Sequence, residues 1–210
     1  MKGEGMGKAR LSLATTVAAL VAAFALAACG DDNDGGSADE DQITAAIERA
    51  ATSGDPAACT DAQTQKFVEQ TSGGASAAAA VKQCEADAAD TPADDVEVSD
   101  IEVDGDTATA NAAVTGSTFD GQTLDLALVK EGDRWKVDEF KGFAEFDREA
   151  MINAFRTELA NEPGVTPAGV DCVVKQFQAA PDEEIEGSFT GSDPQAEERL
   201  FGPCGKYFQG

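Results

Sequence analysis

The chain has 210 residues, of which 40 are acidic, 15 are basic and none is histidine, and its formal net charge is −25. A surface of this charge repels phosphate backbones and anionic headgroups, so we expect no nucleic-acid partner. The absence of histidine excludes Ser-His-Asp and Cys-His catalysis and histidine-ligated zinc, and the chain has no nucleotide-binding glycine motif.

The first segment of the chain has the pattern of an export signal. Basic residues within the first ten positions precede the apolar run Leu11–Ala25, which is shorter than the roughly 20 apolar residues of a spanning helix. The next four residues, Leu26-Ala27-Ala28-Cys29, resemble the lipobox of bacterial lipoproteins. The resemblance implies a signal peptide over 1–28 and a diacylglyceryl group on Cys29, which anchors the protein to the outer face of the cell membrane. The alternative is an ordinary signal peptide or a short uncleaved anchor with a chance cysteine.

An acidic, glycine-rich segment follows the predicted lipid site. Because residues 29–38 have few apolar side chains, we expect a flexible tether there. A calcium-binding loop is the alternative, but aligning Gly36 with the glycine of that motif puts Gly35 and Gln42 where carboxylates are required. The sequence therefore predicts a spacer and no metal.

Three helices are predicted before any strand. Apolar residues recur at helical spacing over 39–54. A second helix is predicted to begin at Thr60, which forms a capping-box pattern with Gln63, and a third covers about 76–88.

From Asp95 onward the apolar residues alternate with polar ones, as in strands with one buried face. The alternation slips by one residue near Ser99-Asp100, which predicts a β-bulge. Turn signals stand at Asp104-Gly105, Asp120-Gly121 and Glu131-Gly132-Asp133. The pattern predicts a four-strand antiparallel curved sheet whose apolar face is covered by the three helices, an α+β fold.

The apolar face of this sheet carries the residues most suited to line a pocket. They are Ala108, Ala110, Ala112, Leu126 and Trp135. Small side chains on such a face either let a helix approach closely or leave an apolar pocket, and we favour close packing. Trp135 is expected in the core by default.

The region 147–210 is predicted to be a helical subdomain. Asp147 can cap one helix, and Thr166-Pro167 and Asp193-Pro194 are start signals for two more. A region this short buries too small a hydrophobic core to be stable without a cross-link such as a disulfide.

Four cysteines remain if Cys29 carries lipid, and three pairings of them are possible. We favour Cys59–Cys84 and Cys172–Cys204, because each pair lies within one group of predicted helices. A metal site is the alternative, but no two cysteines have the CxxC spacing.

The order of elements resembles a known fold. Helices followed by antiparallel strands that end in GDRWKVDEF, residues 132–140, resemble the nuclear-transport-factor-like (cystatin-like) cone domain of small actinobacterial lipoproteins. The resemblance covers 39–146, and the region after it resembles small two-cysteine helical modules of secreted actinobacterial proteins. The cone fold implies a pocket between sheet and helices but no single activity, because it hosts enzymes and binders alike.

We therefore expect a lipid-anchored extracytoplasmic module, without cofactor, that binds an apolar small molecule or an envelope protein and catalyses no reaction. The alternatives are a purely structural envelope protein and a cone-fold enzyme of the isomerase or cyclase type that uses a buried aspartate. Asp125 and Asp138 are the strand acids to consider for that role, but alternation places both on the outward face. Four aromatic residues are expected to dock the helical subdomain on the cone: Phe143, Phe146, Tyr207 and Phe208.

Overall fold

A computed structural model of the chain describes residues 34–72, 76–89, 92–162 and 164–208. These described residues belong to one compact unit. The predicted export signal and Cys29 lie outside the described residues. Within those residues, no helix is both long enough and apolar enough to cross a membrane.

The first helix, α1 (Asp34–Thr52), begins earlier than expected. The predicted tether over 29–38 is therefore wrong in its second half, because 34–38 are helical. Acidic residues favour the positive end of a helix dipole, so a charged segment can form the first turns of a helix. Asp39 further holds this end against the sheet, because its Oδ1 accepts hydrogen bonds from Lys130 and Trp135.

Before the first strand, the described part of the chain has four helices where three were predicted. The additional break separates α2 (Ala58–Asp61) from α3 (Gln65–Ser72). The third predicted helix is confirmed as α4 (Ala77–Asp87), and Ser76 is its N-cap. The predicted capping box at Thr60 is wrong, because the backbone of 62–64 leaves the helix to pair with Val137 of the sheet. Thr64 instead caps α3, accepting a hydrogen bond from the backbone N–H of Phe67.

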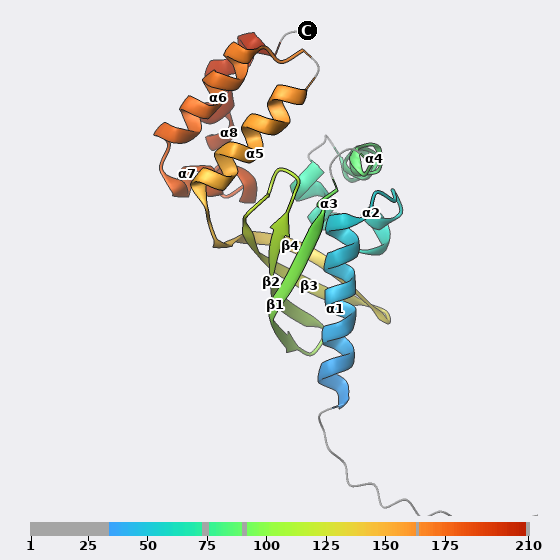
Figure 1. Ribbon diagram of the computed structural model, residues 1–210. Helices are drawn as coiled ribbons and strands as arrows, with labels where there is room; N and C mark the ends of the chain where they lie inside the picture. Colours follow the sequence, from blue (N-terminus) through green and yellow to red (C-terminus); the bar gives the residue numbers. More distant parts are fainter. Residues whose placement is uncertain (1–33, 73–75, 90–91, 163, 209–210) are drawn as a thin grey trace, which may run out of the picture. The chain divides into compact units, whose positions relative to one another are not determined.

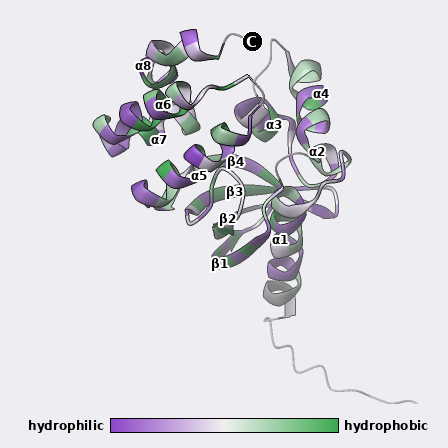
Figure 2. Ribbon diagram, turned by 45° about the horizontal axis from the view of Figure 1, so that its top comes forward, coloured by the Kyte–Doolittle hydropathy of each residue, from purple (hydrophilic) through white to green (hydrophobic). Residues whose placement is uncertain are grey.

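The predicted sheet is confirmed as four antiparallel strands in sequential order (Figure 1). The strands are β1 (Asp95–Asp104), β2 (Thr107–Thr115), β3 (Thr123–Glu131) and β4 (Arg134–Glu145). The register of β1 shifts between Ser99 and Glu102, where Asp100 has φ 50°, which confirms the predicted bulge. Hydrophobic and hydrophilic residues alternate along the strands (Figure 2), so one face is apolar.

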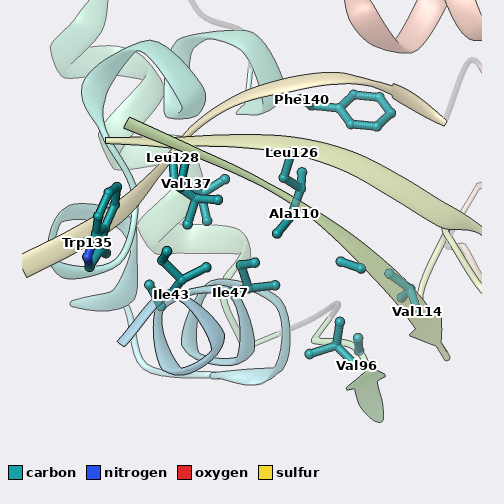
Figure 3. Close-up of a cluster of buried hydrophobic side chains, with 14 residues drawn as sticks. Ile43, Ile47, Val96, Ala110, Val114, Leu126, Leu128, Trp135, Val137 and Phe140 are labelled. Carbon is teal, nitrogen blue, oxygen red and sulfur yellow. The ribbon is translucent and has the colours of Figure 1, made fainter. Parts of the chain in front are cut away.

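The main core lies between that face and the helices. Figure 3 shows Ile43 and Ile47 of α1 pointing toward the sheet, where Ala110 and Leu126 face them. Ala110 exposes only 1 % of its surface. Its short side chain lets the larger side chains of the helix approach the strand closely, as the sequence favoured.

After β4 the chain is helical. The elements are α5 (Arg148–Asn161), α6 (Pro167–Ala179), α7 (Asp182–Thr190), α8 (Ala196–Phe201) and the 3-10 helix η1 (Gly202–Tyr207). The predicted caps Asp147 and Thr166 are confirmed by hydrogen bonds from Ala150 N and Gly169 N. The Cys172–Cys204 disulfide joins α6 to η1. These helices surround a second hydrophobic core.

Aromatic side chains connect the two cores. Phe143 of β4 lies 5.2 Å from Phe140 and 6.1 Å from Phe189 of α7, measured between ring centroids. Phe143, Phe146, Tyr207 and Phe208 all pack against the second core. Gln70 of α3 adds a polar link, because its Nε2 donates to the carbonyl oxygens of both Phe140 and Thr190.

Candidate ligand cavity

A cavity of about 320 Å³ lies between the first group of helices and the apolar face of the sheet. Its volume is at the lower end of the range for small-molecule sites, roughly 300–1,000 Å³. Most of its lining is apolar, with Ile47 and Phe67 on the helices and Val96 and Leu126 on the strands. The cavity is open to solvent on one side and offers an apolar molecule a mostly apolar lining.

The sequence-predicted pocket residues divide into two groups. Ala112 and Leu126 line the cavity. Ala108, Ala110 and Trp135 are buried in the adjoining core and are not among the lining residues.

The Cys59–Cys84 disulfide forms part of the cavity wall. It joins the start of the short α2 to α4, with the two Cα atoms 6.1 Å apart. Together with the Cys172–Cys204 bridge it confirms the favoured pairing of the four cysteines. Disulfides persist in oxidising compartments, so both bridges indicate an extracytoplasmic location.

Gln63 places a polar group in this apolar lining. The residue is 8 % exposed, and its Nε2 lies 3.5 Å from the carbonyl oxygen of Ala50, a marginal hydrogen bond. Its Oε1 lies 3.8 Å from the sulfur of Cys84. Because that sulfur is bonded to Cys59, it carries no hydrogen, and the contact cannot be a hydrogen bond. Within the described residues, the amide oxygen of Gln63 therefore receives no hydrogen bond from the protein.

Charge is nearly absent from the cavity lining. Asp87 is the one acidic residue among the described lining residues, and no lysine or arginine is among them. The Asp87 carboxylate is exposed and accepts hydrogen bonds of 2.9 and 2.7 Å from Nε2 of Gln83 on the same helix. This carboxylate therefore belongs to the solvated rim of the cavity.

The two strand acids considered for catalysis lie elsewhere. Asp138 accepts hydrogen bonds from Thr64 Oγ1 at 2.9 Å and Lys66 Nζ at 3.0 Å. Lys66 also donates a hydrogen bond to Glu139, and both bonds raise the pKa of the lysine, the one to Glu139 having the larger effect. Asp125 pairs with Lys141 at 3.2 Å. Neither aspartate is among the cavity-lining residues.

Comparison with protein-family models, with curated proteins and with solved structures found no match for this chain. The site is therefore interpreted from its own geometry.

A second hollow, of about 460 Å³, lies between the β2–β3 turn and α5 and is more polar. Two of its three acids are already bonded to the protein: Asp120 accepts from Gly116 N at 2.7 Å, and Glu158 accepts from Thr118 Oγ1 at 2.7 Å. Over the described ranges, no group of three metal-ligating side chains is arranged to hold a metal ion.

The signal that could have revealed Gln63 in the sequence was present but ambiguous. A glutamine three residues after a threonine is typical of a capping box, so the sequence assigned Gln63 to a helix end. Its position in the cavity depends on the pairing of 62–64 with Val137, a contact between distant parts of the chain.

Proposed function

We propose that this chain is a membrane-anchored extracytoplasmic lipoprotein whose cone-like domain binds an apolar small molecule. The observation that carries the binding proposal is the apolar cavity of about 320 Å³ between the helices and the sheet. The succession of helices and a curved antiparallel sheet supports the resemblance to the nuclear-transport-factor-like fold over 39–146.

The anchoring proposal is supported by the lipobox-like sequence that ends at Cys29 and by the two disulfides, which suit an exported protein. Two acyl chains on one cysteine give stable membrane binding. Replacing Cys29 with serine removes the acceptor sulfur, so Cys29→Ser should lose all incorporation of labelled palmitate in the native host. The unaltered chain is the control, and a labelled Cys29→Ser protein would contradict the anchor.

The side chains around the cavity support binding of a ligand better than catalysis. General acid–base catalysis requires a titratable group within hydrogen-bond reach of the substrate. The strand acids Asp125 and Asp138 are paired with lysines away from the cavity, and Asp87 lies at its solvated rim.

Native mass spectrometry of the protein isolated from its own host tests the binding proposal. We expect a population heavier than the lipidated polypeptide by the mass of one small molecule, which denaturation releases. If only the unliganded mass is found and a crosslinked envelope protein is recovered instead, the chain is an interaction module and the small-molecule proposal is wrong.

A further inference from the structure

We propose that Gln63 is the polar anchor of the cavity, and that the ligand is an uncharged apolar molecule with one group that hydrogen-bonds to a primary amide. Such a group is a hydroxyl, a carbonyl or an amide. The inference rests on the proposed binding function and names the ligand class and the residue that selects it.

The Gln63 amide is positioned by the backbone around it and, within the described residues, makes only one marginal hydrogen bond. Its neighbours in the chain are fixed to the sheet, since Thr64 N donates to Val137 O at 2.9 Å and Val137 N donates to Ala62 O at 2.9 Å. The side chain is more than nine-tenths buried, yet within the described residues its oxygen faces only a disulfide sulfur without hydrogen. Buried amides are normally hydrogen-bonded, so this oxygen and the poorly bonded Nε2 are suited to a ligand.

A charged group on the ligand would be poorly compensated in this cavity. A charged group inside an apolar cavity is costly unless a counter-charge stands beside it. An anionic headgroup would meet no cation among the described lining residues, and the molecule as a whole carries a net charge of −25. A cationic headgroup would find the only carboxylate among the described lining residues, that of Asp87, on the exposed rim and already bonded to Gln83. The amide offers both a donor and an acceptor, which suits a neutral polar group.

The rest of the lining suits an apolar body. Most of it is aliphatic or aromatic, as at Ile47, Phe67 and Leu126, together with the disulfide. Four hydroxyl side chains also line the cavity, and three of them already bond to nearby backbone groups: Ser53, Thr71 and Ser117, with Ser72 as the fourth. An apolar body fills this space by dispersion and the hydrophobic effect, while a single polar end meets the amide. One polar contact in an apolar site fixes the orientation of the ligand.

A competition experiment on the mature chain, residues 29–210, tests this ligand class. The probe is the fluorophore N-phenyl-1-naphthylamine, bound without detergent to this oxidised chain carrying Cys29→Ser, so that neither acyl chains nor the apolar run Leu11–Ala25 take up the probe. The competitors at pH 7 are octanamide, octanoate and octylamine, which share a chain length and differ in charge. Octanamide should displace the probe at about tenfold lower concentration than either charged competitor. Equal or better displacement by octanoate or octylamine would overturn the inference.

The substitution Gln63→Met tests the anchor, because methionine keeps the length of the side chain and removes the amide. Its affinity for octanamide should fall about fivefold, the effect of one neutral hydrogen bond, while probe binding is kept. Gln65→Met is the matched control, because Gln65 is exposed and bonds only Glu69 among the described residues. That control should leave both affinities unchanged.

The outcomes separate the two proposals. If the probe binds but Gln63→Met and the control bind octanamide equally well, the anchor is wrong and the binding function stands. If neither the probe nor any competitor binds the unaltered cavity, the binding function fails and the anchor with it. If Gln63→Met does not fold, the competitor series on the chain with Gln63 intact still decides the ligand class.

Discussion

Asp39 joins the start of the first helix to the last hairpin of the sheet through one carboxylate oxygen. Its Oδ1 accepts hydrogen bonds from Lys130 Nζ at 2.7 Å and from Trp135 Nε1 at 2.9 Å. Both bonds hold the pKa of Asp39 below its ordinary value of 3.8, and the bond from Lys130 has the larger effect. Because the folded pKa is lower than the unfolded one, ionised Asp39 stabilises the fold above about pH 4. This contribution is lost as the pH falls through the folded pKa.

The variant Asp39→Ala should therefore lower the Tm by a few degrees at pH 7, because both donors lose their acceptor. The difference from the unaltered chain should shrink as the pH falls through the lowered folded pKa of Asp39, because its carboxyl group then becomes protonated. Thermal unfolding followed by the fluorescence of Trp135 measures this effect.

Asp41→Ala is the matched control for that variant, since Asp41 is an exposed aspartate on the same helix. It removes the same charge without removing the acceptor of Lys130 and Trp135. A Tm for Asp39→Ala equal to that of Asp41→Ala would show that the contact contributes nothing to stability.

Individual residues were predicted well where their role is local. The caps Asp147 and Thr166 act on backbone groups three residues away, and the sequence identified both. Gln63 and Thr64 were misassigned because their environment comes from β4. Thr64, for example, bonds Asp138, 74 positions further along the chain.

The two disulfides differ in the elements that they join, although they close loops of similar length. The sequence separations are 25 for Cys59–Cys84 and 32 for Cys172–Cys204. In the chain-entropy model each bridge then stabilises the fold by about 3.5 kcal/mol. Only the first bridge belongs to the cavity wall.

Replacing each pair of cysteines by serines separates stability from binding. Both double variants should lose about 3.5 kcal/mol of unfolding free energy, measured by urea denaturation. The Cys59→Ser/Cys84→Ser variant should in addition bind N-phenyl-1-naphthylamine more weakly, because α4 is no longer held at the cavity. Equal probe affinity in the two variants would contradict the role of the first bridge in the cavity.

Elements with a clear period were predicted, whereas α2 and α7 were not. The strands follow from alternation between clear turn signals, such as the two-residue turn after Asp104, and the alternation slips only at the bulge of β1. The helix α7 was missed because its inward residues, Ile185 and Phe189, give one helical repeat only, and Gly187 lies between them. The same limit affects α2, which has four residues.

The molecule as a whole carries far more negative than positive charge, so its acidic groups repel one another in the folded state. Raising NaCl from about 20 mM to about 500 mM shortens the screening length from tens of ångströms to a few. The Tm at pH 7 should therefore rise by a few degrees, as measured by calorimetry. The increase should vanish near pH 4.1, where the net charge is close to zero. A Tm that falls with salt at pH 7 would mean that the ion pairs outweigh the repulsion.

At the scale of the whole chain, the α+β class and the pairing of the cysteines were predicted correctly. The strands are marked by alternation, and each cysteine pair lies within one group of predicted helices. The contact between the two hydrophobic cores was harder to predict from the sequence. It depends on aromatic side chains such as Phe119 and Phe189, which come from a turn and from the unpredicted α7.

Both edge strands of the sheet, β1 and β4, are poorly suited to pair with a strand of a neighbouring copy. The edge of β4 is occupied by its own chain, since Val137 pairs with the segment 62–64 and Gln70 exchanges two hydrogen bonds with the backbone of Phe140. The other edge, β1, alternates acidic side chains along its length and is bent by the bulge at Asp100. A strand from a neighbouring molecule thus meets a filled edge on one side and a kinked, negatively charged one on the other. Both edges therefore disfavour strand-to-strand aggregation between neighbouring copies.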